Sequence, residues 1–415
     1  MNNYNFSELS NGIQVVTETI PYLKSFSLGF WYKVGTRDEN EKINGISHFL
    51  EHMLFKGTTK RSARKISEDI ESCGGYLNAF TSKEHTCIYG RGLGENLEKT
   101  FAILSDMVQN PLLKDSHIKK EAGVIIDELN DINDNPEELI FDKIEEVLFK
   151  GNTLSYPIIG TEKNILNINN PNLTKFHSSH YGSDNLLISA SGDLKHEQII
   201  KLVEKYFRKS AGTNKRHHKF LERSYPKEVT IDKDINQVHS ILGKRIPGYK
   251  DSGRVKYQLL SSLLGESSSS RLFQAVREKL GITYQINSFL NSYQDISVFG
   301  VYFSTNDKQS EKVQSIIFKE FQKLRENKIN DKELNRTKEY LIGSIILGLE
   351  STNNRMMRLA NSILYFNKII TIEEQIERIK SVTSEDLISI SDWILNKDDY
   401  SRIFVRSNNK AKNAA

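Results

Sequence analysis

The sequence has little cysteine and no long apolar run. Only two cysteines, Cys73 and Cys87, occur in 415 residues, too few for a disulfide framework. We therefore expect both to be small residues that are buried or half-buried. No stretch of about 18 apolar residues is present, so no membrane-spanning helix is expected. Residues 1–18 also lack the basic and apolar regions of a secretory signal, and a cytoplasmic location follows by default.

An excess of charge of one sign is also missing. Lys and Arg number 57 against 53 Asp and Glu, a formal net charge of +4, whereas nucleic-acid-binding proteins usually display a clustered basic stripe. The one basic cluster, residues 215–219 (KRHHK), lies in a polar stretch and is interpreted as part of a solvated linker. Neither a nucleic-acid partner nor a membrane partner is expected.

The first half of the chain shows strands followed by helices. Stretches rich in β-branched and aromatic residues predict the strands, and apolar residues with helical spacing predict the helices. The predicted strands are residues 12–18, 25–34, 76–81, 86–92 and 186–191, and the predicted helices are residues 46–56, 63–72, 95–109, 116–133, 137–149 and 196–207.

A polar stretch without periodicity divides the chain. We predict an N-terminal domain at residues 1–210, a linker at 211–227 and a C-terminal domain at 228–415. The second half repeats the order of the first in outline, which predicts an α+β fold built from a duplicated unit. Its predicted strands are residues 229–231, 238–242, 283–290, 297–304 and 403–405, and its predicted helices are residues 255–264, 270–279 and several that fill 311–351 and continue beyond it.

The motif that carries chemistry is His-x-x-Glu-His, formed by His48, Glu51 and His52. At about 100° per residue, a helix directs these three side chains into one sector. Two imidazoles spaced four residues apart can bind one Zn²⁺, and a carboxylate beside them can take a proton from a water on the metal. The order is a known peptidase signature; the competing interpretation is a chance placement of histidines on a helix face. The apolar neighbours predict a helix buried in the core, with its polar sector facing a cleft.

A catalytic zinc site needs a third protein ligand and an open position for water. In its motifs the chain resembles the pitrilysin and insulinase family of zinc peptidases, most closely the short, processing-peptidase-like bacterial branch. In that family a glutamate on a later helix completes the ligand set, and the resemblance assigns this role to Glu128. Glu121, two turns earlier on the same helix face, matches a carboxylate that the family keeps near the metal.

Two further segments carry the resemblance. The stretch Tyr76–Thr81 is similar to the family's strand beside the metal, where Asn78 and Ala79 would pair with an extended peptide by strand addition. The alternative is an ordinary hairpin strand. Residues 267–284 resemble a stretch in which Arg277 and Tyr284 reach the metal site from the C-terminal half and stabilise the developing oxyanion. Taken singly, an arginine on a helix and a tyrosine on a strand are more often structural.

The resemblance implies two tandem α/β rolls, each a mainly antiparallel sheet with helices packed on one face. Because the family encloses a chamber with four such units, it also implies a homodimer that admits short or unfolded peptides. The implied activity is that of a zinc endopeptidase with Glu51 as the general base on zinc-bound water. Three alternatives stay open: a non-catalytic peptide-binding subunit, one partner of an obligate heterodimer, and a zinc hydrolase that does not act on peptides.

Overall fold

The computed structural model describes residues 3–207, 212, 216, 225–326 and 329–407. Most of the predicted linker at 211–227 lies outside these residues. The chain forms two compact units, and each combines segments from both halves of the sequence. The first unit comprises Met1–Asn130, Asn152–Phe220 and Gly348–Ile370, and the second comprises Asp131–Gly151, Leu221–Leu347 and Thr371–Ala415.

The first unit contains a six-stranded sheet in the order β1-β2-β6-β3-β5-β4. All neighbouring strands are antiparallel except β2 and β6, which are parallel. The strands predicted at 76–81 and 86–92 are present and form the hairpin of β4 and β5, whereas β1 was not expected from the sequence. The strands are β1 (Tyr4–Glu8), β2 (Gln14–Thr19), β3 (Ser25–Tyr32), β4 (Tyr76–Thr81), β5 (Thr86–Leu93) and β6 (Leu186–Gly192).

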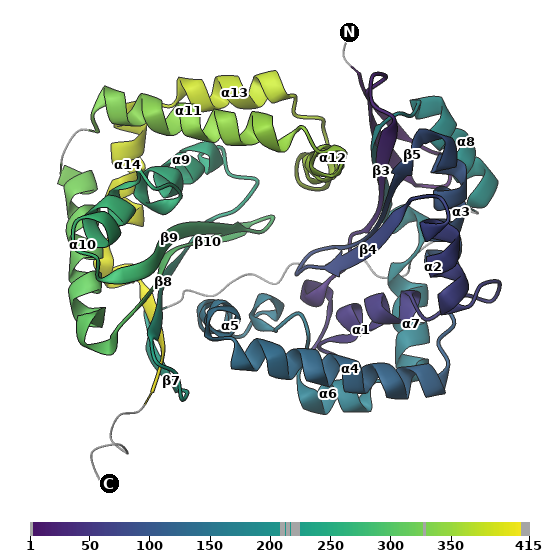
Figure 1. Cartoon of the computed structure of the whole chain (residues 1–415), viewed down its shortest axis with the longest axis horizontal. Coiled ribbons are helices and arrows are strands. Elements are labelled where there is room, and N and C mark those ends of the chain that lie inside the picture. The colour runs from purple at the N-terminus through teal and green to yellow at the C-terminus, as the bar shows by residue number, and fades with distance from the viewer. Residues whose placement is uncertain (1–2, 208–211, 213–215, 217–224, 327–328, 408–415) are drawn as a thin grey trace. The chain divides into compact units, whose positions relative to one another are not determined.

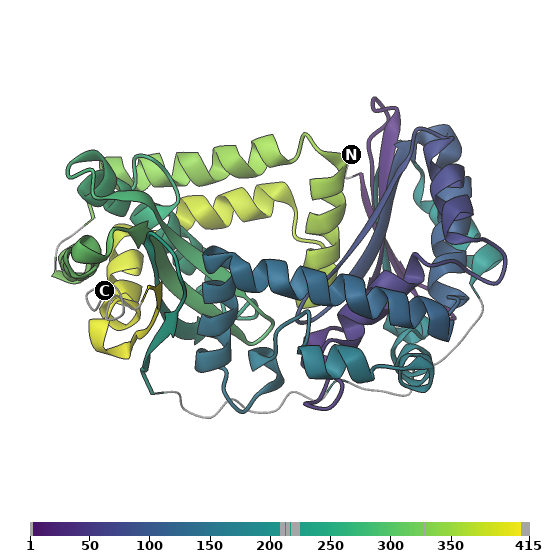
Figure 2. The same cartoon turned by 60° about the horizontal axis from the view of Figure 1, so that its bottom comes forward.

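Helices cover both faces of this sheet. Successive side chains of a strand point to opposite faces, and in β3 the ring of Phe30 packs on Phe101 of α3 (Leu97–Gln109), while Trp31 joins a cluster with Met356 of α12 (Thr352–Phe366). In both views α3 lies on one side of the first sheet and α12 on the other (Figures 1 and 2). Further helices of this unit are α2 (Ala63–Glu71), α6 (Glu162–Asn167), α7 (Asn170–His180) and α8 (His196–Tyr206).

The second unit repeats this topology. Its five strands follow the order β7-β11-β8-β10-β9, with a parallel pair of β7 and β11 and antiparallel pairs elsewhere. The α+β class and the duplication are therefore confirmed. The strands are β7 (Glu228–Asp232), β8 (Val238–Pro247), β9 (Thr283–Ser292), β10 (Ile296–Thr305) and β11 (Ser401–Arg406), and the helices include α9 (Arg254–Gly265), α10 (Ser310–Glu326), α11 (Asp331–Gly348), α13 (Ile372–Ser381) and α14 (Ser384–Ile394).

One helix is exchanged in each direction between the halves of the sequence. The helix α5 (Pro136–Leu148), from the first half, packs on the second sheet, and α12, from the second half, packs on the first. Glycines allow the close approach: a Cβ on Gly243 would lie 2.7 Å from Cγ1 of Ile144, and a Cβ on Gly29 would lie 2.7 Å from Sδ of Met356. The family resemblance predicts that helices cover one face of each sheet. Helices from the same half of the sequence do cover one face, and the helix from the other half covers the opposite face.

Arg216 corrects the interpretation of the basic cluster as solvated linker. Its guanidinium Nε donates to Oδ1 of Asp38 at 2.8 Å, and its side chain is only 20% exposed. Its Nη2 donates to Oδ2 of the same carboxylate, and this half-buried, bidentate ion pair holds the chain at residue 216 against the first unit. The other four residues of the cluster lie outside the described part of the chain.

Two expectations from composition can be compared with the structure. Both cysteines are free, Cys73 half-buried and Cys87 buried, as expected. None of the helices in the described part of the chain is long and apolar enough to cross a membrane.

Candidate metal centre

The N-terminus of α1 (Ile46–Leu54), the helix that carries the His-x-x-Glu-His motif, is held in place by a side chain that caps it. The buried carboxylate of Glu39 accepts hydrogen bonds from the backbone N–H groups of Gly45 and Ser47, both at 2.8 Å. These N–H groups have no partner within the helix, and a negative charge is favourable at a helix N-terminus. Gly45 has a φ of +97°, and a Cβ there would lie 2.7 Å from the carbonyl oxygen of Ile159. Glycine is therefore required at this turn.

The predicted division of α1 into an apolar and a polar sector is confirmed. His48, Glu51 and His52 are only partly buried, whereas the side chains around them have no exposed surface. These buried side chains are Phe49, Leu50, Met53 and Leu54. The helix is anchored by its apolar sector, so the three polar groups are presented together.

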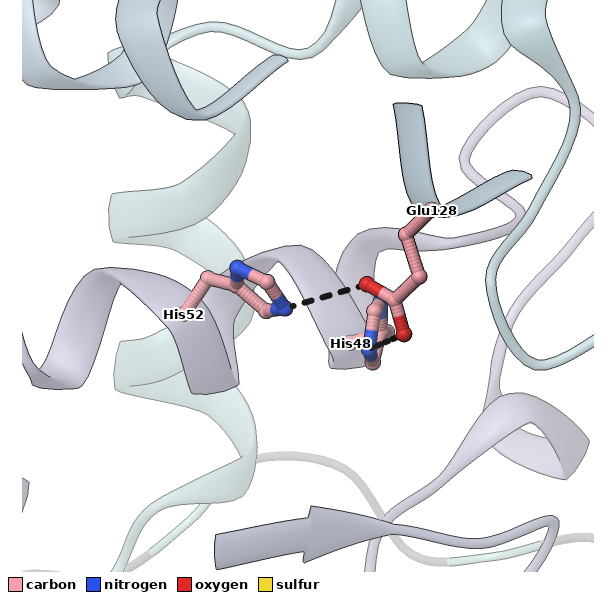
Figure 3. A group of neighbouring side chains, drawn as sticks. All are labelled: His48, His52 and Glu128. Carbon is pink, nitrogen blue, oxygen red and sulfur yellow. Dashed lines mark ion pairs between the residues drawn. The ribbon is translucent and has the colours of Figure 1, made fainter. Parts of the chain in front are cut away.

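The third predicted ligand, Glu128, comes from α4 (Asp115–Asp134) and meets both histidines. Its Oε1 lies 3.7 Å from Nε2 of His48, and its Oε2 lies 3.5 Å from Nε2 of His52 (Figure 3). One ligand atom from each residue lies within 4.8 Å of the other two. Ligand atoms bound at about 2 Å to a tetrahedral zinc ion are about 3.3 Å apart, so this set of two imidazoles and one carboxylate fits Zn²⁺. Within the described residues it is the one group of this kind.

Glu121 lies where it can orient a ligand. Its side chain is only 2% exposed, and its Oε2 lies 3.4 Å from Nδ1 of His52. A hydrogen bond from Nδ1–H to this carboxylate leaves the lone pair on Nε2 for a metal. The Nζ of Lys56 lies 2.7 Å from the other oxygen of Glu121, which compensates the buried charge.

The protonation of the group follows from its surroundings. Burial, together with the neighbouring His52, lowers the pKa of His48 to about 4, so His48 is neutral near pH 7, as a metal ligand must be. Burial alone would lower the pKa of His52, but the carboxylates of Glu128, Glu51 and Glu121 outweigh it and raise the pKa. The pKa of Glu128 is lowered, mainly by its interaction with His52. The centre thus pairs the ionised carboxylate of Glu128 with imidazoles.

Glu51 stands beside the ligand group and has a partner of its own. The hydroxyl of Thr81 on β4 donates a hydrogen bond of 2.6 Å to Oε2 of Glu51. Burial raises the pKa of Glu51, and the bond from Thr81 opposes that shift. A raised pKa in a positioned carboxylate is typical of a general base, whose pKa should approach the working pH.

Asn78 and Ala79 lie on β4, the edge strand of the first sheet, which pairs only with β5. Strand addition by a peptide needs such an edge. Here the backbone N–H of Ala79 donates to Oδ1 of Asn78 at 2.9 Å, and Nδ2 of Asn78 donates to the hydroxyl of Tyr76 at 2.9 Å. Peptide binding by these two residues stays a prediction.

Arg277 and Tyr284 lie in the second unit. Arg277 belongs to a π-helical turn, Phe273–Glu278, within the predicted helix at 270–279, and its guanidinium lies 4.8 Å from the centre of the Phe273 ring. Tyr284 is the second residue of β9 and is 79% exposed. Their catalytic roles stay predictions.

Three residues that sequence reasoning did not assign contribute to the centre. They are Glu39, which caps α1, Lys56, which pairs with Glu121, and Thr81, which holds Glu51. Lys56 follows His52 by four residues, and within the helix predicted at 46–56 this spacing would place the two side chains on one face, although α1 ends at Leu54. The contacts of Glu39 and Thr81 depend on the fold, and no local pattern indicates them.

Comparisons with known proteins agree with these features. Residues 14–162 match the family described as insulinase (peptidase family M16), and residues 167–341 match the peptidase M16 inactive domain. A protein of Rickettsia felis named "Uncharacterized zinc protease" is 35% identical over 95% of this chain and 95% of its own length. A Bacillus subtilis protein, also named an uncharacterized zinc protease, is 34% identical over 94% of this chain and 95% of its own length.

Two solved structures share the fold. The crystal structure of a protease from Helicobacter pylori matches with a TM-score of 0.89 at 24% identity, covering 98% of this chain and 100% of the other. The crystal structure of a peptidase M16 inactive domain from Pseudomonas fluorescens matches with a TM-score of 0.90 at 20% identity, covering 98% of each chain. At these identities the likeness concerns the fold alone.

Proposed function

Because this chain belongs to peptidase family M16, the insulinase family, we propose that it is a zinc-dependent endopeptidase acting on short or unfolded peptides. The observation that carries the proposal is the meeting of His48, His52 and Glu128 beside a general base held by Thr81. The names of the relatives as zinc proteases support the metal and the reaction class.

In this proposal His48, His52 and Glu128 hold the metal, and Glu121 fixes the tautomer of His52. When bound, Zn²⁺ would supply Lewis acidity, which makes water more acidic and polarises a carbonyl. Glu51 accepts the proton of the attacking water and then delivers it to the leaving amine. The bond from Thr81 holds one carboxylate oxygen of Glu51, which leaves the other for the proton.

Four further residues take their proposed roles from the family resemblance. Asn78 and Ala79 bind the peptide backbone at the edge strand. Arg277 and Tyr284 hold the scissile carbonyl and stabilise the charge that develops on its oxygen. Exposure of Tyr284 and the edge position of β4 support these roles.

We extend the proposal to a homodimer whose chamber admits peptides but excludes folded proteins. The motive is the presence of two α/β units in this chain, against four in the family's closed chamber. Sedimentation at the working concentration should find a dimer. A fully active monomer would refute this part.

The first test is cleavage of a quenched fluorescent peptide of roughly ten to twenty residues with one arginine. The wild type should cleave it, and Glu51→Gln should lose about 10²–10⁴-fold in kcat while retaining its zinc by elemental analysis. Glu68→Gln, on an exposed residue of α2 that pairs with Arg64, is the control and should be fully active. Turnover at the wild-type level in Glu51→Gln would contradict the assignment of the base.

The same experiment addresses the alternatives. If neither the wild type nor Glu51→Gln cleaves peptides, three alternatives remain: a non-catalytic binding subunit, one partner of a heterodimer, and a zinc hydrolase of another class. Adding candidate partner chains then identifies the heterodimer, because only a heterodimer gains activity that depends on Glu51. A zinc hydrolase of another class would bind zinc and leave every peptide intact.

A further inference from the structure

Tyr284 sits at an irregularity in the second sheet. Where β9 pairs with β10, Ser304 lies opposite Gln285, and the next residue of β10, Thr305, lies opposite Thr283. Tyr284 therefore has no partner on β10 and is the extra residue of a β-bulge. Bulges bend a strand and re-aim a side chain, and they are frequent beside active sites. The consequence is visible in the exposure, which is 79% for Tyr284 and 7% for its neighbour Thr283.

The hydroxyl of Thr283 closes this bulge. Its Oγ1 lies 2.6 Å from the carbonyl oxygen of Ser304 on β10 and 2.7 Å from the carbonyl oxygen of Gln285 on its own strand. A hydroxyl has one proton to donate, so it is shared between carbonyls on the two strands. Thr305 adds a hydrogen bond from its hydroxyl to the carbonyl of Ile282. Both backbone segments that flank Tyr284 are thereby held by threonine hydroxyls.

Arg277 also sits on an irregular segment. The N–H of Lys279 donates to the carbonyl of Gln274 at 3.2 Å, which is the five-residue spacing of a π-helix. Such turns are rare and are often found at functional sites. The guanidinium of Arg277 is supported by the ring of Phe273, one turn earlier. Tyr284 therefore lies on a β-bulge and Arg277 on a π-turn. These are the two residues of the second unit to which the family resemblance assigns a role.

We propose that Thr283 is a positioning residue for Tyr284: its hydroxyl maintains the bulge that turns the phenol away from the sheet and toward substrate. The inference rests on the proposed function for the role of Tyr284, and on the register and hydrogen bonds for the role of Thr283. The competing explanation is that Thr283 only contributes to the stability of the second unit.

The kinetic test compares Thr283→Val, which keeps the shape and removes the hydroxyl, with Thr283→Ser, which keeps the hydroxyl. Tyr284→Phe should lower kcat by about 100-fold, as removal of an oxyanion donor does, and Thr283→Val by about tenfold with KM nearly unchanged. Thr283→Ser should recover the wild-type rate. In the double variant Thr283→Val/Tyr284→Phe the rate should equal that of Tyr284→Phe within about twofold, because the two residues act through one group.

A matched control separates positioning from stability. Thr337 on α11 has the same 7% exposure, and its hydroxyl also donates to a backbone carbonyl, that of Glu333 at 3.0 Å. Thr337→Val should lower the melting temperature about as much as Thr283→Val and leave kcat unchanged. If Thr283→Val behaves as this control does, or if its loss adds fully to that of Tyr284→Phe, the proposal is overturned.

A second readout does not depend on activity. In protein labelled with 3-fluorotyrosine, the ¹⁹F resonance missing from Tyr284→Phe belongs to Tyr284. That resonance should shift in Thr283→Val and stay in place in Thr283→Ser and Thr337→Val. An unmoved resonance in Thr283→Val overturns the proposal even if no peptide is cleaved. If the resonance moves but Tyr284→Phe is fully active and Glu51→Gln is inactive, the positioning role fails while the peptidase assignment stands.

Discussion

The two units share a strand order but differ in the side chains that could bind a metal. Five strands of the first sheet, in the order β2-β6-β3-β5-β4, correspond to β7-β11-β8-β10-β9 of the second. In each series the chain runs from the third strand, β3 or β8, into helices and then into a hairpin, β4–β5 or β9–β10. In the first unit the helix at this place is α1, with its sector of histidines and a glutamate. In the second it is α9, whose sequence RVKYQLLSSLLG contains neither histidine nor carboxylate and is buried along most of its length.

This difference shows that scaffold and chemistry have separate requirements. A sheet with helices needs only apolar residues at the proper period, and both units have these. A metal centre needs particular side chains at particular points, and only the first unit has them among the residues that the structure describes. His239 is the sole histidine after residue 218, so the second unit has few imidazoles to offer.

The largest expected effect comes from removing a ligand. His52→Ala should reduce bound zinc from about one ion per chain to nearly none and abolish peptide cleavage, because a catalytic zinc keeps only three protein ligands. Elemental analysis of the purified protein measures the metal. His239→Gln is the control from the second unit and should retain full zinc. Loss of zinc in His239→Gln would contradict the conclusion that the first unit holds the metal centre.

The exchanged helices allow a symmetrical test of the packing. Met356 and Ile144 are fully buried, and replacing either by alanine should cost about 2–5 kcal/mol in the free energy of local unfolding. Hydrogen exchange should accelerate in β2, β3 and β6 for Met356→Ala, and in β8 and β11 for Ile144→Ala. If Met356→Ala instead loosens the second sheet, the exchange of α5 and α12 is wrong.

A smaller effect is expected from the carboxylate behind the ligand. Glu121→Gln should weaken zinc binding by about 10–100-fold, as loss of a partner of a ligating histidine usually does, because the amide that replaces the carboxylate carries no charge toward His52. Competition with a chelator of known affinity gives the constant. Asp127→Asn, an exposed position on the same helix, should leave the affinity unchanged. Equal effects of the two substitutions would argue against the orienting role.

The smallest effect is expected at the partner of the base. Thr81→Val removes one hydrogen bond to Glu51 and should lower kcat by about tenfold, the low end for a hydrogen bond to a charged group, while zinc content stays the same. Steady-state kinetics beside Thr81→Ser, which keeps the hydroxyl, measures this. A zinc loss in Thr81→Val would show that Thr81 supports the ligands and not the base.

Local pattern was enough to predict the elements around the centre. The helix expected at 46–56 is found at Ile46–Leu54, and the strand expected at 76–81 is found at Tyr76–Thr81. β1 was not predicted, because it is an edge strand with little burial and its sequence therefore shows no buried face.

Other features depend on contacts between distant parts of the chain. The period of a helix does not reveal which sheet it covers, so the exchange of α5 and α12 was not visible. A π-turn or a bulge differs from regular structure by one residue, a change that leaves the apolar pattern almost intact. The ion pair of Arg216 with Asp38 likewise joins segments far apart in sequence.

The sequence by itself determined that His48, Glu51 and His52 share one sector of a helix, because a helical period of 3.6 residues is a local property. Resemblance to the family then indicated Glu128, which no local rule could do. Only the tertiary structure decided that the carboxylate of Glu128 lies beside both imidazoles, that Thr81 holds Glu51 and that Tyr284 has no partner on β10. These contacts join separate helices and strands, and the packing of those elements brings them together.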